Sequence, residues 1–505
     1  MGHQQGDIRD ALETIETVEA RRVPRLFRYL LTRLSAAALL LAACLGAWAE
    51  APRPNIIHIL ADDMGYGDAG FNGQRRIKTP NLDRLAREGM VFRQHYAGCT
   101  VCSPSRACLM TGMHTGRVTV DRNAAELSMP ADEVTVAEVL RDAGYRCHFI
   151  GKWGLGGGDM SDDLWTAQLG WQTGTGALIP GQEPSLPTRQ GFDTSLAYLN
   201  QLYAHLYYPV ALWRNETRER IPGNQSPVYD ERAVYSHDLL EAETLRLIQE
   251  ADGSRPFYIQ CSYTLPHRET KAPKGYEPYA DRDWPEVEKA YAVMITRLDD
   301  TVGAVLDAVD GTPPVAANTL IIFTSDNGPQ STDGHSPFFF DSNGPLRGSK
   351  RDLYEGGIRA PTAMRWKGVV AEGSATGHCS AFWDFLPTCA ELAGAKAPEG
   401  LDGISFVPTL TGKGEQREHD FLFWSFHEHG AGPTKDGGRE PVQRFAVRRG
   451  DWKLVVLRDG RRELYNLAED IGETTNVAEQ HPDVTAALHA IALREEARGP
   501  DGGRD

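Results

Sequence analysis

Short apolar segments alternate with amphipathic helical segments along this chain, and that alternation restricts its fold more than any other feature. Residues 55–60, NIIHIL, and residues 319–324, TLIIFT, are Ile-rich runs typical of buried strands. A helical pattern at residues 135–144 begins with a capping box formed by Thr135 and Glu138. Strands separated by helices pair mostly in parallel, so the sequence predicts an α/β fold: a large, mostly parallel, mixed sheet with helices on both faces. The other predicted strands are 147–150 and 256–261, and the other predicted helices are 79–89, 236–251 and 285–309.

The C-terminal part has a different pattern. Its short apolar strands, within residues 444–467, are interrupted by Gly450 and by Asp459-Gly460, which is typical of antiparallel hairpins. A helical segment follows, with Pro482 near the favoured first position. We therefore predict a small antiparallel sheet plus a helix after the large domain. The predicted parts are a leader over 1–49, the large domain over 50–415 and the small C-terminal part over 416–505.

The N-terminal segment has the pattern of an export signal. Arg28 and Arg33 precede the apolar run LSAAALLLAACLGAWA, which is short for a membrane span. Ala47-Trp48-Ala49 has the small residues of a cleavage site. The alternative is a bacterial lipobox, in which Cys44 becomes a lipid-anchored first residue. Both interpretations predict an exported protein, either free in the periplasm or extracellular space or held at the membrane as a lipoprotein.

Polar residues follow four of the predicted strands. Asp62-Asp63 and Lys152 lie directly after two of them, His267 lies six residues beyond a third, and Asp326-Asn327 follow the fourth. Because ligands bind at the carboxyl ends of the strands in open α/β sheets, these side chains are predicted to share one site. The formal net charge of −16 argues against a nucleic-acid partner, although it leaves room for a small basic pocket that binds an anion.

Three of the eight cysteines fall within the segment GCTVCSPSRACLMTG. A redox pair of Cys99 and Cys102 is one interpretation. A zinc site that includes Cys108 is a second, but no matching downstream Cys pair or His cluster supports it. Neither interpretation accounts for the Pro and Arg that follow Cys102.

A third interpretation explains those neighbours. Ser103 is a plausible helix N-cap, and Pro104 then occupies the first helical position, where proline is favoured. Cys102 would lie at the positive end of a helix, with the Arg106 cation four residues on. A nucleophile or an anion-contacting group belongs at such a position.

The segment CSPSRACLMTG resembles the signature of the type I sulfatases, C-x-P-S-R-x-x-x-x-T-G. Met113 stands where an Arg usually follows, a minor departure. The resemblance covers about residues 52–480 and implies an arylsulfatase-like hydrolase with the fold of the alkaline phosphatase superfamily. It also implies that a formylglycine-generating enzyme oxidises Cys102 to formylglycine during export. Cys99 and Cys108 are then either buried small apolar residues or disulfide partners.

The resemblance extends to the expected metal ligands. RPNIIHILADDMGYGD resembles the family's opening strand and implies Asp62 and Asp63 as ligands, and FTSDNG implies Asp326 and Asn327. Three carboxylates and an amide are hard oxygen donors. They suit Ca²⁺, with Mg²⁺ as the alternative, and they do not suit zinc.

Three further residues match family elements, and one position departs from them. Lys152 in GKWGLG and Lys350 in PLRGSKRDLYEGGIRAP match active-site lysines, and His267 in YTLPHRET matches a Pro-His element. The usual family pattern is G-K-W-H-L-G, whose His contacts the formylglycine, but this chain has Gly154 there. We hypothesise that His205, in NQLYAHLYYP, enters the site from another loop.

The resemblance also implies a mechanism for cleaving a sulfate monoester, of a sulfated carbohydrate or an aryl sulfate. One hydroxyl of the hydrated aldehyde, a gem-diol, attacks sulfur, and the second later expels the sulfate. Arg106, Lys152, Lys350 and a divalent cation neutralise the sulfate oxygens. His267 or Lys350 is the expected proton donor to the leaving oxygen.

Two rival functions stay open at this point. A phosphodiesterase or phosphonate monoester hydrolase of the same superfamily could use the same oxidised cysteine and metal, although the YEGGIRAP segment and the C-terminal hairpins favour a sulfatase. A non-catalytic binder that keeps the metal site is the second rival, and Gly154 is the feature in its favour.

Overall fold

The computed structural model describes residues 53–124, 127–156, 183–199, 201, 203–224, 233–428 and 430–499. The predicted leader over residues 1–49, with the cleavage site and the lipobox cysteine Cys44, lies outside these residues. None of the described helices has both the length and the apolar character of a membrane span.

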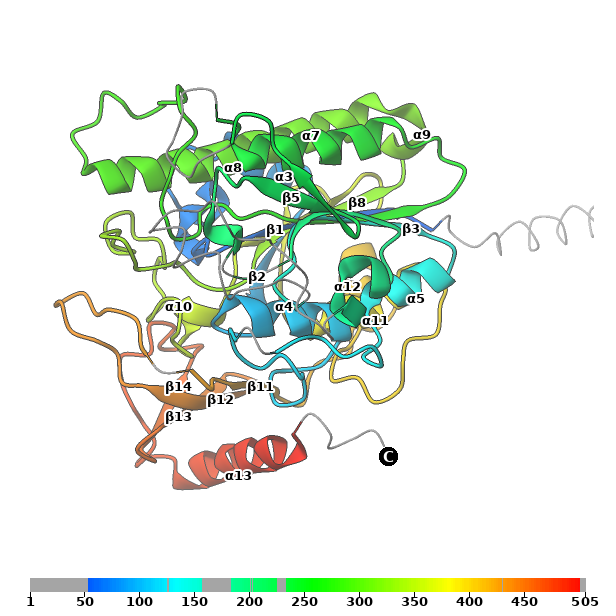
Figure 1. Cartoon of the computed structure of the whole chain (residues 1–505). Coiled ribbons are helices and arrows are strands. Elements are labelled where there is room, and N and C mark those ends of the chain that lie inside the picture. The colour runs from blue at the N-terminus through cyan, green and yellow to red at the C-terminus, as the bar shows by residue number, and fades with distance from the viewer. Residues whose placement is uncertain are drawn as a thin grey trace, which may run out of the picture. The chain divides into compact units, whose positions relative to one another are not determined.

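A large mixed sheet of ten strands forms the centre of the described chain (Figure 1). The neighbours β8, β1, β7, β3 and β4 pair in parallel, and so do β10 and β2, whereas β9, β5 and β6 run antiparallel to their neighbours. The predicted mostly parallel, mixed sheet is therefore confirmed. Its order is β10 (Ser374–Ala381), β2 (Met90–Tyr96), β9 (Thr362–Trp366), β8 (Thr319–Ser325), β1 (Asn55–Ala61), β7 (Phe257–Ser262), β3 (Arg146–Lys152), β4 (Thr194–Tyr198), β5 (Ala211–Arg214) and β6 (Thr217–Arg220).

Alternate residues of β1 supply two separate cores, one on each face of the sheet. Ile56 and Leu60 belong to one core, whereas Ile57 and Ile59 belong to the other. This is the two-residue period of a strand that is buried on both faces. The helices that cover the first face are α4 (Cys102–Thr111), α5 (Val136–Asp142), α10 (Glu355–Ile358), α11 (Phe385–Leu392) and α12 (Val407–Thr411). Those that cover the second face are α3 (Pro80–Arg87), α7 (Ser236–Gln249), α8 (Glu286–Gly311) and α9 (Pro313–Ala316) (Figure 1).

Short 3₁₀ helices connect several of these elements. One of them, η5, brings His205 to the site described below. The described 3₁₀ helices are η1 (Tyr66–Asp68), η2 (Gly70–Asn72), η3 (Glu183–Ser185), η4 (Pro187–Arg189), η5 (Tyr203–His205) and η6 (Phe382–Asp384).

The C-terminal strands form a second, antiparallel sheet with a helix beside it, as predicted (Figure 1). Helix α13 packs its Leu488 and Ile491 against this sheet. The predicted boundary between the two parts, near residue 415, stays a prediction. The elements are β11 (Leu422–Ser425), β12 (Gln443–Arg449), β13 (Trp452–Leu457), β14 (Arg462–Asn466) and α13 (Pro482–Arg498).

A buried ionic cluster joins the small sheet to helix α10, which packs on the first face of the large sheet. Lys453, on β13, is fully buried, and its Nζ lies 2.9 Å from Glu355 Oε1 and 2.9 Å from Glu473 Oε1. Both carboxylates are fully buried as well, and Glu355 also pairs with Arg359 at 2.7 Å. Removing one member of such a cluster leaves an uncompensated charge in a medium of low dielectric.

Lys453→Met is therefore expected to lower the free energy of unfolding by about 3–5 kcal/mol, because two buried carboxylates lose their shared cation. Urea denaturation followed by circular dichroism measures this loss. Lys396→Met is the matched control, since Lys396 pairs with Glu399 at 2.8 Å while both side chains are more than four-fifths exposed. The control should change stability by no more than about 0.5 kcal/mol. Equal effects of the two substitutions would contradict a stabilising role for the cluster.

Candidate functional site

Helix α4 holds Cys102 at its first position. The helix begins at Cys102 with Val101 at the N-cap, so the prediction that Ser103 caps it and Pro104 opens it is wrong. The physical reason is that Asn123 Oδ1 accepts the Ser103 N–H at 2.9 Å from outside the helix, and Pro104 has no N–H to satisfy. Cys102 nevertheless lies at the positive end of the helix, as expected.

Two consecutive carboxylates reach Cys102 from the end of β1. Asp63 has a φ of +67°, a left-handed conformation that Asp tolerates better than most residues. That conformation ends the alternation of the strand, so both carboxylates approach the same sulfur. Cys102 Sγ lies 3.3 Å from Asp62 Oδ1 and 3.9 Å from Asp63 Oδ1. Burial, followed by the Asp62 carboxylate, raises the pKa of the Cys102 thiol far above its usual range.

Arg106 lies one turn along α4 and binds the carboxylate that follows β8. Its Nη2 and Nε donate to Asp326 Oδ2 at 2.7 and 3.1 Å, and its Nη1 donates to the Lys152 carbonyl at 2.8 Å. Asp326 Oδ1 accepts the Asp63 N–H at 3.1 Å. Burial and the nearby Asp62 raise the pKa of Asp326, whereas Arg106 opposes that shift. Helix α4 and the ends of two adjacent strands are thus held together by one buried ion pair.

Two lysines lie against the two aspartates. Lys152, the last residue of β3, donates to Asp62 Oδ2 at 2.6 Å. Lys350 donates to both oxygens of Asp63, at 2.6 and 2.7 Å, and its Nζ is 3.4 Å from Cys102 Sγ. Burial alone would lower the pKa of Lys350, but Asp63 outweighs it and the pKa is raised, so this lysine is a fixed positive charge. The sulfur therefore lies within reach of both acidic and basic groups.

Two histidines stack beside these charges. His267, in the loop after β7, has its Nε2 3.0 Å from Lys350 Nζ and 3.3 Å from Asp63 Oδ2. The His205 ring lies 4.2 Å from the His267 ring, centroid to centroid, at 25° between planes. Burial and the cationic side chain of Lys350 lower the pKa of His267 well below its usual value, and burial and Lys152 do the same for His205. Both rings are therefore neutral near pH 7.

The group of oxygen donors fits a hard divalent cation. Asn327 Nδ2 donates to Asp63 Oδ1 at 2.7 Å, but its carbonyl oxygen Oδ1 is buried and has no partner among the described residues. A buried carbonyl without a partner is costly unless an ion or a water satisfies it. Ligand atoms of Asp62, Asp63, Cys102 and His267 also lie within 4.8 Å of one another. The donors are mostly oxygens, the chemistry that Ca²⁺ and Mg²⁺ prefer.

All ten residues that the sequence predicted for the site lie in this single buried network, and each of them contacts at least one of the others. Sequence reasoning missed two residues of its wall: Asn123, which accepts from Ser103 N–H, and Gln201, whose Oε1 accepts from Ser103 Oγ at 3.2 Å. No motif marks either residue. The ten are Asp62, Asp63, Cys102, Arg106, Lys152, His205, His267, Asp326, Asn327 and Lys350.

The cysteines flanking Cys102 form no disulfide. Cys99 and Cys108 are both buried, and they and the other cysteines in the described part of the chain are free. Cys99 and Cys108 are therefore buried, small apolar residues in this structure and not disulfide partners. It also excludes a Cys99–Cys102 disulfide in this conformation.

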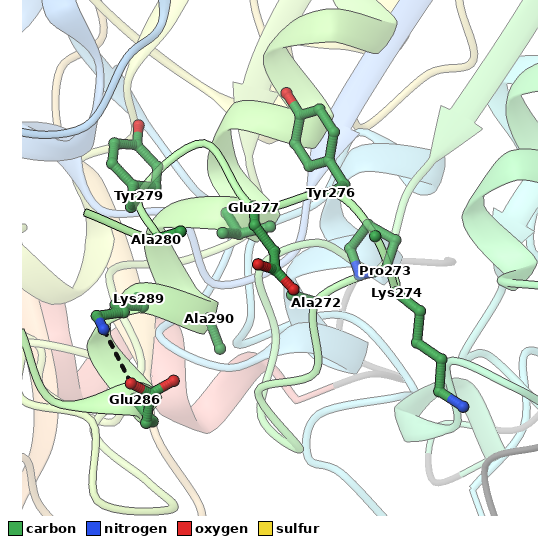
Figure 2. A pocket seen from close by; sticks show the side chains of 12 residues that line it. Ala272, Pro273, Lys274, Tyr276, Glu277, Tyr279, Ala280, Glu286, Lys289 and Ala290 are labelled. Carbon is green, nitrogen blue, oxygen red and sulfur yellow. Dashed lines mark hydrogen bonds and ion pairs between the residues drawn. The ribbon is translucent and has the colours of Figure 1, made fainter. Parts of the chain in front are cut away.

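A separate cavity of about 380 Å³ lies on the loop that follows His267 and on the start of α8 (Figure 2). It is lined by side chains that include Tyr276 and Glu277, and Lys289 pairs there with Glu286 at 2.9 Å. None of the ten predicted site residues lines it. The reactive groups are gathered in the buried network instead, so this cavity is not the chemical centre.

Two family models match the chain. One, described as Sulfatase, matches residues 54–395, and one described as N-sulphoglucosamine sulphohydrolase, C-terminal, matches residues 348–497. The first covers the large sheet and every residue of the network. The second covers the small sheet and all but the last residue of helix α13.

Individual proteins are similar over most of the chain. Arylsulfatase A of Homo sapiens is 31% identical over 502 residues, which is 90% of each chain. Steryl-sulfatase of Homo sapiens is 31% identical over 435 residues, 74% of this chain and 72% of the relative. The solved structure described as Ps i-CgsB in complex with k-i-k-neocarrahexaose is 25% identical with a TM-score of 0.71, and the match covers 90% of this chain and 95% of that one.

Proposed function

Because this chain belongs to the sulfatase family, within the alkaline phosphatase superfamily, and is therefore a sulfuric ester hydrolase, we propose that residue 102 supplies its nucleophile. In this proposal Cys102 is oxidised to formylglycine by a formylglycine-generating enzyme. The hydrated aldehyde supplies a hydroxyl that attacks sulfur and a second hydroxyl that allows the sulfate to leave. Fully buried Cys102, with Asp62 at 3.3 Å and Lys350 at 3.4 Å, is the observation that carries it.

Asp62, Asp63, Asp326 and Asn327 are the proposed ligands of a divalent cation, Ca²⁺ with Mg²⁺ as the alternative. The unpartnered Asn327 carbonyl oxygen and the three convergent carboxylates support this ligand set. The cation would supply positive charge beside the sulfate oxygens and lower the pKa of the nucleophile.

Three cationic side chains of the protein supply the remaining positive charge around the sulfate oxygens. Lys152, Lys350 and Arg106 are buried and held in place by carboxylates, so they need no reorganisation when negative charge develops on the sulfate oxygens. Lys350, a cation, is placed to donate a proton to the leaving alcohol, and His267, whose Nε2 lies 3.0 Å from Lys350 Nζ, is the alternative donor if it takes up a proton from that lysine. Each group of this kind contributes about 10²–10⁴-fold to the rate.

A sulfated saccharide is the proposed substrate class, with an aryl sulfate as the simpler alternative. The wall beside the nucleophile is polar, since Ser103, Asn123, Gln201 and Glu428 are joined there by hydrogen bonds. Such groups suit a ligand with many hydroxyls better than an apolar one. The similarity to a structure solved with a neocarrahexaose also supports a saccharide.

Two measurements test this function. Mass spectrometry of the tryptic peptide from Gln94 to Arg106 should show that residue 102 is lighter than cysteine by the loss of H₂S and the gain of one oxygen. Turnover should be found with para-nitrophenyl sulfate and with defined sulfated saccharides. An unmodified thiol after native export, with no turnover, would favour the non-catalytic binder. Turnover of an aryl phosphate diester in preference to every sulfate would favour the phosphodiesterase.

Export is part of the proposal. It provides the compartment in which the cysteine is modified, and the sequence pattern of residues 1–49 supports it. The mature protein is then periplasmic or extracellular, or a lipoprotein anchored at Cys44. Labelling with a radioactive fatty acid, compared between the parent and Cys44→Ala, separates these two forms.

His205→Ala is expected to lower kcat for para-nitrophenyl sulfate by about 10²-fold, because His205 Nε2 is buried without a partner among the described residues and is free to bond the ester. His205→Phe keeps the ring stacked on His267 and lacks the nitrogen, so it should be equally slow. Steady-state kinetics of the three proteins decide this. Full turnover in His205→Ala would remove the residue from the catalytic set, and recovery in His205→Phe would reduce its role to packing.

A further inference from the structure

Gly154 leaves an empty side-chain position next to the nucleophile. It follows β3 with a φ of +71°, a conformation that favours glycine and that Asn tolerates better than most other residues. Its N–H donates to the Leu199 carbonyl at 3.1 Å, and the Trp153 N–H donates to the Tyr198 carbonyl at 2.9 Å. The chain that follows β4 therefore runs alongside Gly154 and is held there by backbone bonds.

Gln201, in that neighbouring segment, faces the position where a side chain at residue 154 would begin. A Cβ built on Gly154 would lie 3.0 Å from Gln201 Oε1, 3.5 Å from Ser103 Oγ and 3.8 Å from Arg106 Cδ. None of these three nearest atoms belongs to His205, which stacks on His267 instead. The half-buried amide of Gln201 thus closes the space beside Ser103 and Arg106.

The same amide holds the residue that follows the nucleophile. Ser103 Oγ donates to Gln201 Oε1 at 3.2 Å, while the Ser103 N–H donates to Asn123 Oδ1 at 2.9 Å. Asn123 is in turn fixed by Glu428, whose Oε1 accepts the Asn123 N–H at 2.7 Å. Two side chains from separate segments therefore hold the first turn of α4 at Ser103, and residue 102 is directly attached to it.

We propose that Gln201 is a positioning residue: its amide takes the place of the side chain that residue 154 lacks and holds Ser103 so that residue 102 faces the sulfate ester. This inference rests on the proposed function. Because Gln201 acts through Ser103 and not on the substrate, its loss should lower kcat and leave KM nearly unchanged. Small displacements of a reacting group are costly, so we expect about a tenfold loss in kcat for Gln201→Ala.

A double-mutant cycle tests whether the Gln201 amide occupies the space that a side chain at residue 154 would fill. Gly154→Asn places a Cβ too close to Gln201 Oε1 for an undisturbed fit, so this substitution alone should also lower kcat by several-fold. In Gly154→Asn/Gln201→Ala the Asn amide can enter the vacated space and accept from Ser103 Oγ. The double variant should therefore recover most of the lost kcat. Simple addition of the two losses, or an unchanged kcat in Gln201→Ala, would overturn the proposal.

Gln416→Ala is the matched control. Gln416 Oε1 accepts the Thr409 N–H at 3.0 Å, away from the site, so its loss should lower the melting temperature and leave kcat unchanged. Turnover of para-nitrophenyl sulfate by the parent is measured first. If the parent shows no turnover, that result contradicts the proposed function but not the placement of Gln201. In that case the melting temperatures of the parent, the two single variants and the double variant still test whether Gln201 and a side chain at residue 154 compete for the same space. Both single variants should melt at a lower temperature than the parent, and the double variant should recover. Additive melting temperatures would overturn it.

Discussion

Cys102→Ala is expected to turn over para-nitrophenyl sulfate about 10⁴–10⁶-fold more slowly than the parent, because it removes the nucleophile and leaves only the surrounding charges. The measurement is kcat/KM at equal protein concentration, with metal content measured on the same samples. Asp62, Asp63 and the two lysines pair with one another without the sulfur, so the variant should stay folded.

Cys102→Ser separates the two halves of the reaction. The serine hydroxyl can attack sulfur and release the alcohol, which leaves an O-sulfate on residue 102. Without a second hydroxyl on the same carbon, that ester must wait for an external water. We therefore expect a burst of about one phenol per protein followed by slow turnover. The tryptic peptide from Gln94 to Arg106 should then carry an added sulfate.

Cys108→Ala is the matched control for both variants. Cys108 lies on the same helix and is also fully buried, with its Sγ 3.7 Å from the Gly98 carbonyl oxygen. Its truncation should cost about 1 kcal/mol of stability and leave kcat within twofold of the parent. Parent-like activity in Cys102→Ala, or equal losses in the two alanine variants, would refute residue 102 as the nucleophile.

Asp326→Ala is expected to lose the bound divalent cation and at least about 10³-fold in kcat. The substitution removes a proposed ligand and leaves Arg106, which is nearly fully buried, without its partner at 2.7 Å. The free energy of unfolding should fall by about 3–5 kcal/mol for the same reason. Metal analysis after dialysis, together with urea denaturation, checks both expectations. In the parent, a chelator should abolish turnover, and Ca²⁺ should restore it better than Mg²⁺.

Asp310→Ala controls for the loss of a carboxylate that pairs with a buried arginine. Asp310 Oδ1 lies 2.8 Å from Arg365 Nη2, and the Arg365 side chain is only 2% exposed. This variant should lose stability and keep its metal. Full metal occupancy in Asp326→Ala would remove Asp326 from the ligand set.

The sheet and the position of the site can be predicted from local features of the sequence. The Ile-rich run of β1 and the matching run of β8 are buried on both faces, and such runs are recognisable without tertiary information. Once they are parallel neighbours, their carboxyl ends meet, and the acidic residues after them must converge. The contact between Asp63 N–H and Asp326 Oδ1 is the result.

Other parts of the site depend on contacts between distant residues and have no local signal. The start of α4 depends on Asn123, which accepts the Ser103 N–H from outside the helix, so a cap rule applied to Ser103 and Pro104 alone chose the wrong first residue. Gln201 Oε1 lies 3.0 Å from where a Cβ on Gly154 would be, a proximity that no spacing in the sequence reveals. Lys453 has the pattern of a surface residue in a hairpin, yet it is fully buried between two carboxylates.

The buried Lys453 cluster also sets an order of events during translation. A chain is synthesised from its N-terminus, so Lys453 and Glu473 leave the ribosome long after Lys350 and Glu355. Until they arrive, Glu355 lacks the Lys453 cation with which it pairs at 2.9 Å. A chain that stops before β13 would therefore leave Glu355, which is fully buried, without Lys453, and it should be less stable than the full chain.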